Sequence, residues 1–211
     1  MLAHSPFARR ELGHRRTRGG QAGATNVGDQ ADMLLGEKVC LGPVLNGDVS
    51  LLFAWFDNPD MAGASGPYQP QSETRFVQWL HSAAGDPTRV MFVIRKRADL
   101  RLLGHLHISN IQTALRSAEL GVGIGQPADR GQGYGPEALR LAVGFCWREL
   151  NLQRLSLTVL GNNPWAQHVY EKAGFQVEGR LRRATFADGQ FHDVIAMGML
   201  RPDTGDAFQP V

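Results

Sequence analysis

PADRGQGYGP, residues 127–136, is the most informative segment of this sequence for the fold. An alternating apolar pattern, typical of a strand, precedes it at 118–125. Apolar residues at helical spacing follow it, through residue 150. The segment is therefore predicted to be a glycine-rich turn from a strand into a helix. Such a turn gathers free backbone N–H groups at the positive end of the helix, which favours phosphate binding.

The spacing of the glycines excludes two common phosphate-binding loops. A P-loop requires Gly-Lys-Ser/Thr after its glycines, and the segment lacks it. A dinucleotide-binding turn carries GxGxxG after the first strand, whereas Gly131, Gly133 and Gly135 are spaced by two and lie late in the chain. A turn that serves chain geometry alone remains the alternative.

The flanking patterns predict an α/β domain on a mixed sheet, in the order β-α-α-β-β-β-α-β-α-β-β. Asp48, Ser72 and Asn163 are expected to cap helices, and Gly174 to end one. Helices are predicted at 49–56, 73–84, 135–150 and 164–173. Strands are predicted at 39–45, 90–96, 102–108, 118–125, 155–159, 175–181 and 192–200.

The chain is expected to form one domain between two tails. Residues 1–32 are rich in Gly, Arg and His and lack apolar periodicity, so we expect a disordered tail. The domain is predicted to span 33–203, and 204–211 to be a flexible C-terminus. Within the domain, 58–70 is a Pro/Gly-rich loop.

Composition narrows the class of protein. The 211 residues are 43% hydrophobic and 20% charged, which is typical of a globular domain. No apolar run reaches the roughly 18 residues that span a bilayer, so no membrane partner is expected. The net charge is +2 with +3 in residues 1–30, so the domain offers no basic surface for nucleic acid. The two cysteines lie in apolar patterns, which favours a reducing cytoplasm.

Two motifs occur in a characteristic order. The first is Arg130-x-x-Gly133-x-Gly135, and the second is Asn163-x2-Ala166-x3-Tyr170-Glu-Lys-Ala-Gly-Phe175. With them, the sequence resembles the GNAT N-acetyltransferase superfamily over 36–200. The segments AELG at 118–121 and DGQFHD at 188–193 are similar to the branch with ribosomal-protein N-terminal acetyltransferases and spermidine N-acetyltransferases.

The resemblance implies a fold and a co-substrate. The GNAT fold has a mixed, mostly antiparallel sheet with a splayed parallel strand pair and helices on both faces. Acetyl-CoA would lie in the splayed gap, and no metal is implied. Asn163 would cap a helix and contact the pantetheine arm. The other cofactor-binding residues implied are the strand residues Gly123, Ile124 and Gly125 and the turn residues Arg130, Gly131, Gly133, Tyr134 and Gly135.

The implied reaction is direct attack of an amine on the thioester in a ternary complex. A free amine has a pKa near 10, so a base must first remove its proton. Glu119 is the candidate base, directly or through water; its alternative is a solvated carboxylate or an ion pair with Arg116 or Arg154. Tyr170 is the candidate acid for the CoA thiolate; its alternative is a packed ring with a locally bonded hydroxyl.

The acceptor site is expected around the first helices and the later strands. The candidate substrate-binding residues are Trp55, Tyr68, His107 and Asp193. His105 and His107 share a strand face, but no cluster supplies a third metal ligand. A polyamine carries several positive charges, so its site would need several carboxylates. This part of the sequence offers Asp57, Asp60 and Glu73.

Three functions remain open from the sequence. The leading interpretation is acetylation of a small-molecule amine: a polyamine, an amino sugar or an antibiotic. The alternatives are acetylation of protein N-terminal α-amines and a non-catalytic module that binds acyl-CoA. The resemblance also implies a homodimer.

Overall fold

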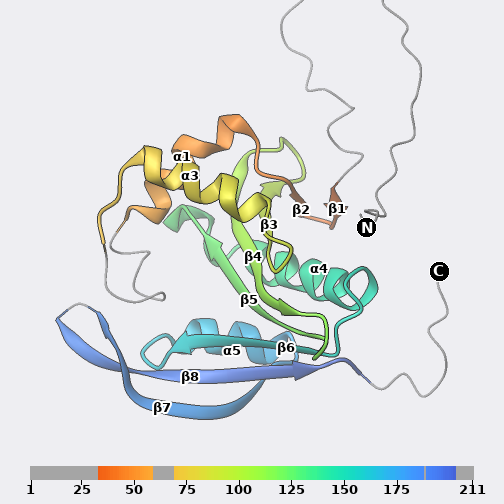
Figure 1. Cartoon of the computed structure of the whole chain (residues 1–211), viewed down its shortest axis with the longest axis vertical. Coiled ribbons are helices and arrows are strands. Elements are labelled where there is room, and N and C mark those ends of the chain that lie inside the picture. The colour runs from red at the N-terminus through yellow and green to blue at the C-terminus, as the bar shows by residue number, and fades with distance from the viewer. Residues whose placement is uncertain (1–32, 59–68, 188, 203–211) are drawn as a thin grey trace, which may run out of the picture. The chain divides into compact units, whose positions relative to one another are not determined.

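The computed structural model describes residues 33–58, 69–187 and 189–202, and these form a single mixed sheet with helices on both faces (Figure 1). The strand order is β1-β2-β3-β4-β5-β6-β8-β7, antiparallel except for β5 and β6. The GNAT-type α/β fold predicted from the sequence is confirmed. The strands are β1 (Leu34–Leu35), β2 (Val39–Gly42), β3 (Val90–Lys96), β4 (Leu102–Gln112), β5 (Ser117–Ile124), β6 (Arg154–Leu160), β7 (Gln176–Ala187) and β8 (Gln190–Leu200).

Two helix pairs cover the two faces of the sheet. On one face, α1 (Val49–Phe56) and α3 (Glu73–Ala84) bury apolar side chains against Val93. On the other, α4 (Tyr134–Arg148) and α5 (Pro164–Lys172) pack into the larger core, which includes Ile94. Val93 and its neighbour Ile94 serve different cores because successive side chains of a strand point to opposite faces. No helix within the described residues is long and apolar enough to cross a bilayer.

The helix ends follow the sequence signals, with one exception. Ser72 Oγ accepts from Arg75 N–H at 3.2 Å, and Asn163 Oδ1 accepts from Ala166 N–H at 3.0 Å. Asp48 occupies the N-cap position of α1 without capping it. Its carboxylate instead accepts from Leu45 N–H and forms a buried ion pair with Arg95 at 2.6 Å. The predicted Asp48 cap is therefore wrong, because a buried cation competes for the same oxygen atoms.

The sheet opens between its two parallel strands. β5 pairs with β6 only across residues 117–119 and 154–156. Beyond that point β5 stays paired with β4 as far as Ile124, and β6 stays paired with β8 as far as Leu160. The upper half of β5 therefore has an unpaired edge, which confirms the expected splay.

Candidate active site

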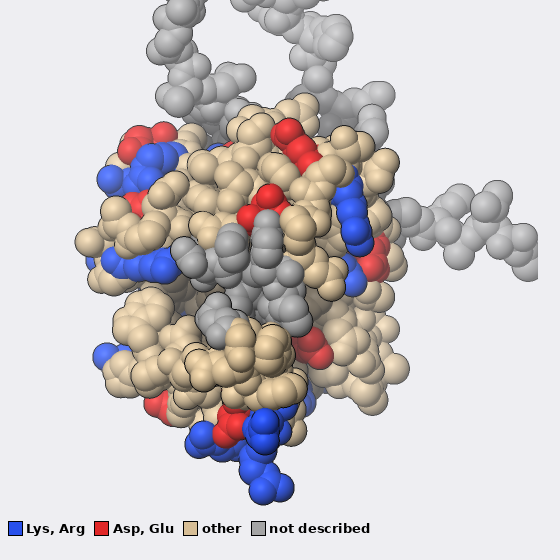
Figure 2. All heavy atoms as spheres, turned by 90° about the vertical axis from the view of Figure 1, so that its left-hand side faces the viewer, with Lys and Arg blue, Asp and Glu red and all other residues tan. Residues whose placement is uncertain are grey.

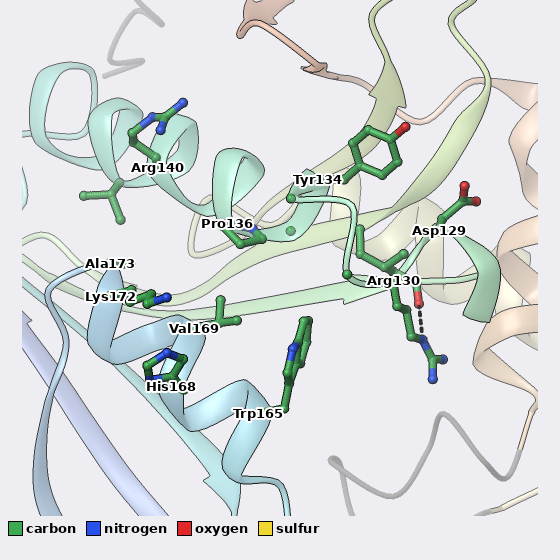
Figure 3. Close-up of a pocket in the computed structure, with 15 residues that line it drawn as sticks. Asp129, Arg130, Tyr134, Pro136, Arg140, Trp165, His168, Val169, Lys172 and Ala173 are labelled. Carbon is green, nitrogen blue, oxygen red and sulfur yellow. Dashed lines mark hydrogen bonds between the residues drawn. The ribbon is translucent and has the colours of Figure 1, made fainter.

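The predicted glycine turn lies where α4, β5 and α5 meet, beside a cavity of about 430 Å³ (Figure 3). The turn contains the 3-10 helix η3 (Pro127–Asp129) and leads into α4 at Tyr134. From α5, Trp165 and Val169 point toward the turn (Figure 3). The five turn residues expected from the sequence all line this cavity: Arg130, Gly131, Gly133, Tyr134 and Gly135.

The turn presents a row of unpartnered backbone amides. Gly133 is the N-cap of α4 with φ +85°, and no side chain caps the helix. Gly131 has φ +75°, and both values lie in the region that glycine adopts without strain. None of the N–H groups of residues 131–135 donates to another residue that the structure describes. An anion of pyrophosphate size fits such a cradle, because the amides and the helix dipole both favour negative charge.

Neighbouring segments hold the turn in place. Arg101 binds the Asp129 carboxylate through two hydrogen bonds of 2.8 and 2.7 Å. Arg130 Nε donates to Ile124 O at 3.4 Å (Figure 3), which closes the turn onto the end of β5. The turn is thus attached to the segment just before β4 and to the end of β5 independently of any ligand.

Lys38 is a functional candidate that the sequence did not indicate. Its Nζ donates to Gln132 O at 3.2 Å and lies 3.3 Å from the position a Cβ would take at Gly133. The buried Glu137 carboxylate accepts from the backbone N–H groups of Glu37 and Lys38, which attaches this segment to the first turn of α4. Lys38 is 94 residues from its contact, so no local spacing could have shown it.

We expect Lys38→Met to raise the KM for acetyl-CoA about 5-fold and to leave kcat unchanged, because an exposed cation beside the anion cradle is lost. The effect is expected to shrink with added salt. Steady-state kinetics at two salt concentrations check this, with Arg75→Met on α3 as the control for charge loss. An equal KM in Lys38→Met and in the unmodified protein would contradict the assignment.

The register of β5 shows which backbone groups face the gap. Gly125 N–H donates to Leu103 O on β4 at 2.9 Å. Since hydrogen-bonded pairs recur every second residue in an antiparallel ladder, Gly123 also directs its backbone toward β4. The expectation that Gly123 and Gly125 offer backbone groups to the gap is therefore corrected. The groups that face the gap are the N–H and C=O groups of Val122 and Ile124 and the carbonyl of Leu120, whose N–H is used in the last pair with β6.

A second cavity, of about 620 Å³, lies at the opening of the sheet and brings together the two residues proposed for proton transfer. Glu119 lines it from β5, and Tyr170 lines it from α5. The described lining also includes Trp55 and Phe56 from α1, His105 and His107 from β4, and polar side chains of β4, β6 and β7: Ser109, Arg154, Ser156, Thr158 and Glu178.

Glu119 has an exposed carboxylate with one polar contact. Asn110 Nδ2 donates to its Oε1 at 3.2 Å. The two arginines considered as ion-pair partners are engaged elsewhere: Arg116 with Asn151 and Arg154 with Glu178. The ion-pair alternative for Glu119 is thus wrong.

Tyr170 is a buried ring, 9% exposed, with an edge-on contact to Phe175. Its hydroxyl makes no hydrogen bond to any residue that the structure describes, so the local-bond alternative finds no partner there. Burial raises the pKa of this hydroxyl, which keeps the proton on it at neutral pH.

A family model described as acetyltransferase (GNAT) domain matches residues 38–176. The chain belongs to the GNAT acetyltransferase family. GNAT enzymes use acetyl-CoA as co-substrate, and the amide cradle described above fits its pyrophosphate.

Similar proteins and structures agree with this family. The acetyltransferase is 29% identical to spermidine N(1)-acetyltransferase of Vibrio cholerae over 74% of this chain and 84% of that protein. It is 31% identical to spermidine N(1)-acetyltransferase of Escherichia coli K12 over 72% and 75% of the two chains. A crystal structure of the Vibrio cholerae spermidine N-acetyltransferase with CoA and spermine superposes with TM-score 0.73 at 26% identity, covering 77% of this chain and 95% of that one.

The GNAT structure also places the remaining predicted site residues. Trp55 and His107 line the larger cavity. Asn163 caps α5 and lines neither cavity. Asp193 is bound within the β7–β8 hairpin, where it accepts from Arg180 Nε and Arg183 N–H, and it lines neither cavity. Tyr68 lies outside the described residues. Among those residues no group of three or more His, Cys, Asp or Glu is arranged to hold a metal ion.

Proposed function

We propose that this acetyltransferase moves the acetyl group of acetyl-CoA to a primary amine of a small molecule by direct attack in a ternary complex. One observation carries the proposal. A single cavity at the opening between β5 and β6 is lined by both Glu119 and Tyr170. A carboxylate and a neutral hydroxyl at one site supply the base and the acid that the reaction requires.

The protons balance across these two side chains. Glu119 takes a proton from the ammonium form of the substrate, directly or through one water. The amine nitrogen then bonds to the thioester carbonyl carbon as the carbon–sulfur bond breaks. The Tyr170 hydroxyl gives its proton to the sulfur of the leaving thiolate. The acetylated nitrogen then loses its second proton, directly or through water, to the Tyr170 phenolate, which restores the hydroxyl, and Glu119 releases its proton to solvent. The N–H group of Val122, which faces the gap beyond the last β5–β6 pair, is positioned to stabilise negative charge on the carbonyl oxygen.

The names of the relatives support an amine as acceptor. Both spermidine N(1)-acetyltransferases carry a polyamine in their names, and the similar crystal structure holds spermine.

The two cysteines, Cys40 and Cys146, are buried free thiols, which supports our placement of the protein in the cytoplasm.

Release of CoA, measured with a thiol-reactive dye, tests the proposed function. Acetyl-CoA is combined with polyamines, amino sugars, amino acids and peptides with free N-termini, and binding of acetyl-CoA is measured in the same samples. We expect release with at least one small amine. Turnover of the peptides but of no small amine would indicate instead that the protein acetylates protein N-termini. Binding without any release would indicate a non-catalytic acyl-CoA module.

We expect Glu119→Gln to lower kcat/KM for the amine by about 100-fold at pH 7, because general-base catalysis contributes roughly that factor. The loss is expected to narrow as the pH rises toward the pKa of the amine, since more substrate is then already neutral. Glu149→Gln, an exposed position at the end of α4, is the control. A loss in Glu119→Gln that does not change with pH would contradict the role as base.

A further inference from the structure

The acceptor side of the larger cavity carries a shelf of flat rings, which we define as Trp55, Phe56, His105 and His107. The Phe56 and His105 ring centroids lie 4.5 Å apart. The two imidazoles are nearly parallel, at 12°, with centroids 6.3 Å apart. Phe56 also contacts Phe76 and Trp79 of α3, so the shelf continues into the aromatic core between the helices.

Glycines of β5 allow the ring shelf to lie on the strand backbone. A Cβ at Gly121 would come within 2.1 Å of the His107 ring, and one at Gly125 within 2.1 Å of the Trp55 ring. A Cβ at Gly123 would lie 2.8 Å from the His105 ring. The alternating glycines therefore leave the space that three rings occupy close to the β5 backbone, directly beside the gap where the thioester is expected. This gives the Gly121-x-Gly123-x-Gly125 pattern a role apart from pantetheine binding.

The shelf carries little charge at neutral pH. Desolvation, with a smaller contribution from His107, lowers the pKa of His105 to about 4. The pKa of His107 is lowered as well, by desolvation and by Arg89, against an opposing effect of Glu119. Both imidazoles are neutral at pH 7, so the shelf is an uncharged aromatic surface.

The described lining supplies one uncompensated carboxylate. Glu178 forms a two-bond ion pair with Arg154, so Glu119 alone has no cationic partner in the cavity. Two of the acidic residues that a polyamine would need are used elsewhere: Asp57 accepts from Gln71 N–H, and Glu73 accepts from the Ser50 hydroxyl. Neither lines the cavity, and Asp60 lies outside the described residues. A triamine would find one negative charge for three positive ones in this lining.

Taking the proposed acetyl transfer as given, we propose that the preferred acceptor is a primary amine with a single positive charge, carried on an aromatic or other flat apolar group. The ammonium group meets Glu119, and the apolar group covers the ring shelf. Burial of a flat group against aromatic rings is favourable, whereas additional ammonium groups would lose hydration without gaining a partner. This acceptor differs from the spermidine named for the relatives.

A panel of four amines tests the inference on the unmodified protein. 2-Phenylethylamine is compared with butylamine, 1,4-diaminobutane and spermidine at saturating acetyl-CoA, with CoA release as the readout. We expect kcat/KM for 2-phenylethylamine to exceed that for spermidine at least 10-fold, with butylamine between them. Calorimetric titration of the protein–CoA complex is expected to rank 2-phenylethylamine and spermidine in the same order.

The outcomes separate this inference from the proposed function. Spermidine or 1,4-diaminobutane at or above 2-phenylethylamine would overturn the inference and leave acetyl transfer to amines intact. Release with no amine, while acetyl-CoA binds, would contradict the proposed function and the inference with it.

A charge placed on the shelf provides a second test. His107→Asp adds a carboxylate beside the amine site and is expected to raise the ratio of kcat/KM for spermidine to that for 2-phenylethylamine about 10-fold. His81→Asp makes the same change on the exposed side of α3 and is expected to leave that ratio unchanged. An equal ratio in the two variants would contradict the ring shelf as the determinant of specificity.

Discussion

Tyr170→Phe is expected to lower kcat by about 100-fold while the Kd for acetyl-CoA stays within about 2-fold of its original value. The substitution removes one oxygen atom that has no protein hydrogen-bond partner among the described residues and keeps the ring that packs on Phe175. Stability should therefore change little, and the loss should fall on the step in which the thiolate leaves. Stopped-flow kinetics with calorimetry of acetyl-CoA binding measure the two quantities separately.

The pH dependence gives this prediction a second readout. Because burial raises the pKa of Tyr170, the acid stays protonated throughout the neutral range. The unmodified protein should therefore lose kcat on the alkaline side only above about pH 10, the usual pKa of tyrosine. Tyr170→Phe should lack that alkaline loss. A variant with full kcat would remove Tyr170 from the mechanism without affecting the family assignment.

Stability should fall between pH 7.5 and pH 5 because of His105. Its pKa is about 4 in the folded protein, against 6.5 for an ordinary histidine side chain, so between these values the unfolded chain binds a proton that the folded chain does not. A lowered histidine pKa gives full stability above pH 6.5, and this stability is lost progressively toward pH 4. The expected loss between pH 7.5 and pH 5 is about 2 kcal/mol, a range in which most carboxylates stay charged.

Replacement of His105 by phenylalanine should remove this part of the pH dependence. The ring keeps its contact with Phe56, and a buried nitrogen, Nδ1, without a hydrogen-bond partner among the described residues is lost. Urea unfolding at the two pH values measures the effect, with His81→Phe on the exposed face of α3 as the control. A fall in stability of the same size in His105→Phe and in the unmodified protein would show that other groups cause it.

Local signals predicted the parts of the fold that local interactions determine. Ser72 and Asn163 cap helices because each side chain binds an amide three residues away, a contact visible in sequence spacing. The turn at Gly131–Gly135 depends on positive φ, which glycine reveals directly. The two-residue strand β1 is too short to leave a pattern, and the sequence did not predict it.

Long-range contacts determine what the sequence did not show. Whether Gly123 or Ile124 faces the gap depends on the register of β5 against β4, which one residue of slip would reverse. Lys38 reaches the anion cradle only through the pairing of distant strands and the Glu137 anchor. Asp193 carries a carboxylate that could bind an amine. On the paired strand β7, however, the Arg180 side chain and the Arg183 backbone N–H both donate hydrogen bonds to it.

The sequence shows the charged residues of the β7–β8 hairpin but not which of them are paired. Arg180, Arg182 and Arg183 are exposed on β7, and basic residues gather at the lower end of the molecule in Figure 2. Arg183 lies over the Phe191 ring at 5.1 Å, while Arg180 pairs with Asp193. Pairing across the hairpin, and not sequence order, determines which of these charges are partly compensated.

The limited pairing of β5 gives the sheet an edge in its interior. Its outward amides, at Val122 and Ile124, have no strand to bond with, so they should exchange their hydrogens with solvent more readily than amides that are paired within the sheet. A linear thioester arm laid along this edge would act as a ninth strand and complete the ladder. Binding of acetyl-CoA to the folded state alone would raise the free energy of unfolding by about 2.7 kcal/mol when its concentration is 100 times the Kd. Acetyl-CoA would therefore stabilise the folded protein as well as serve as its co-substrate.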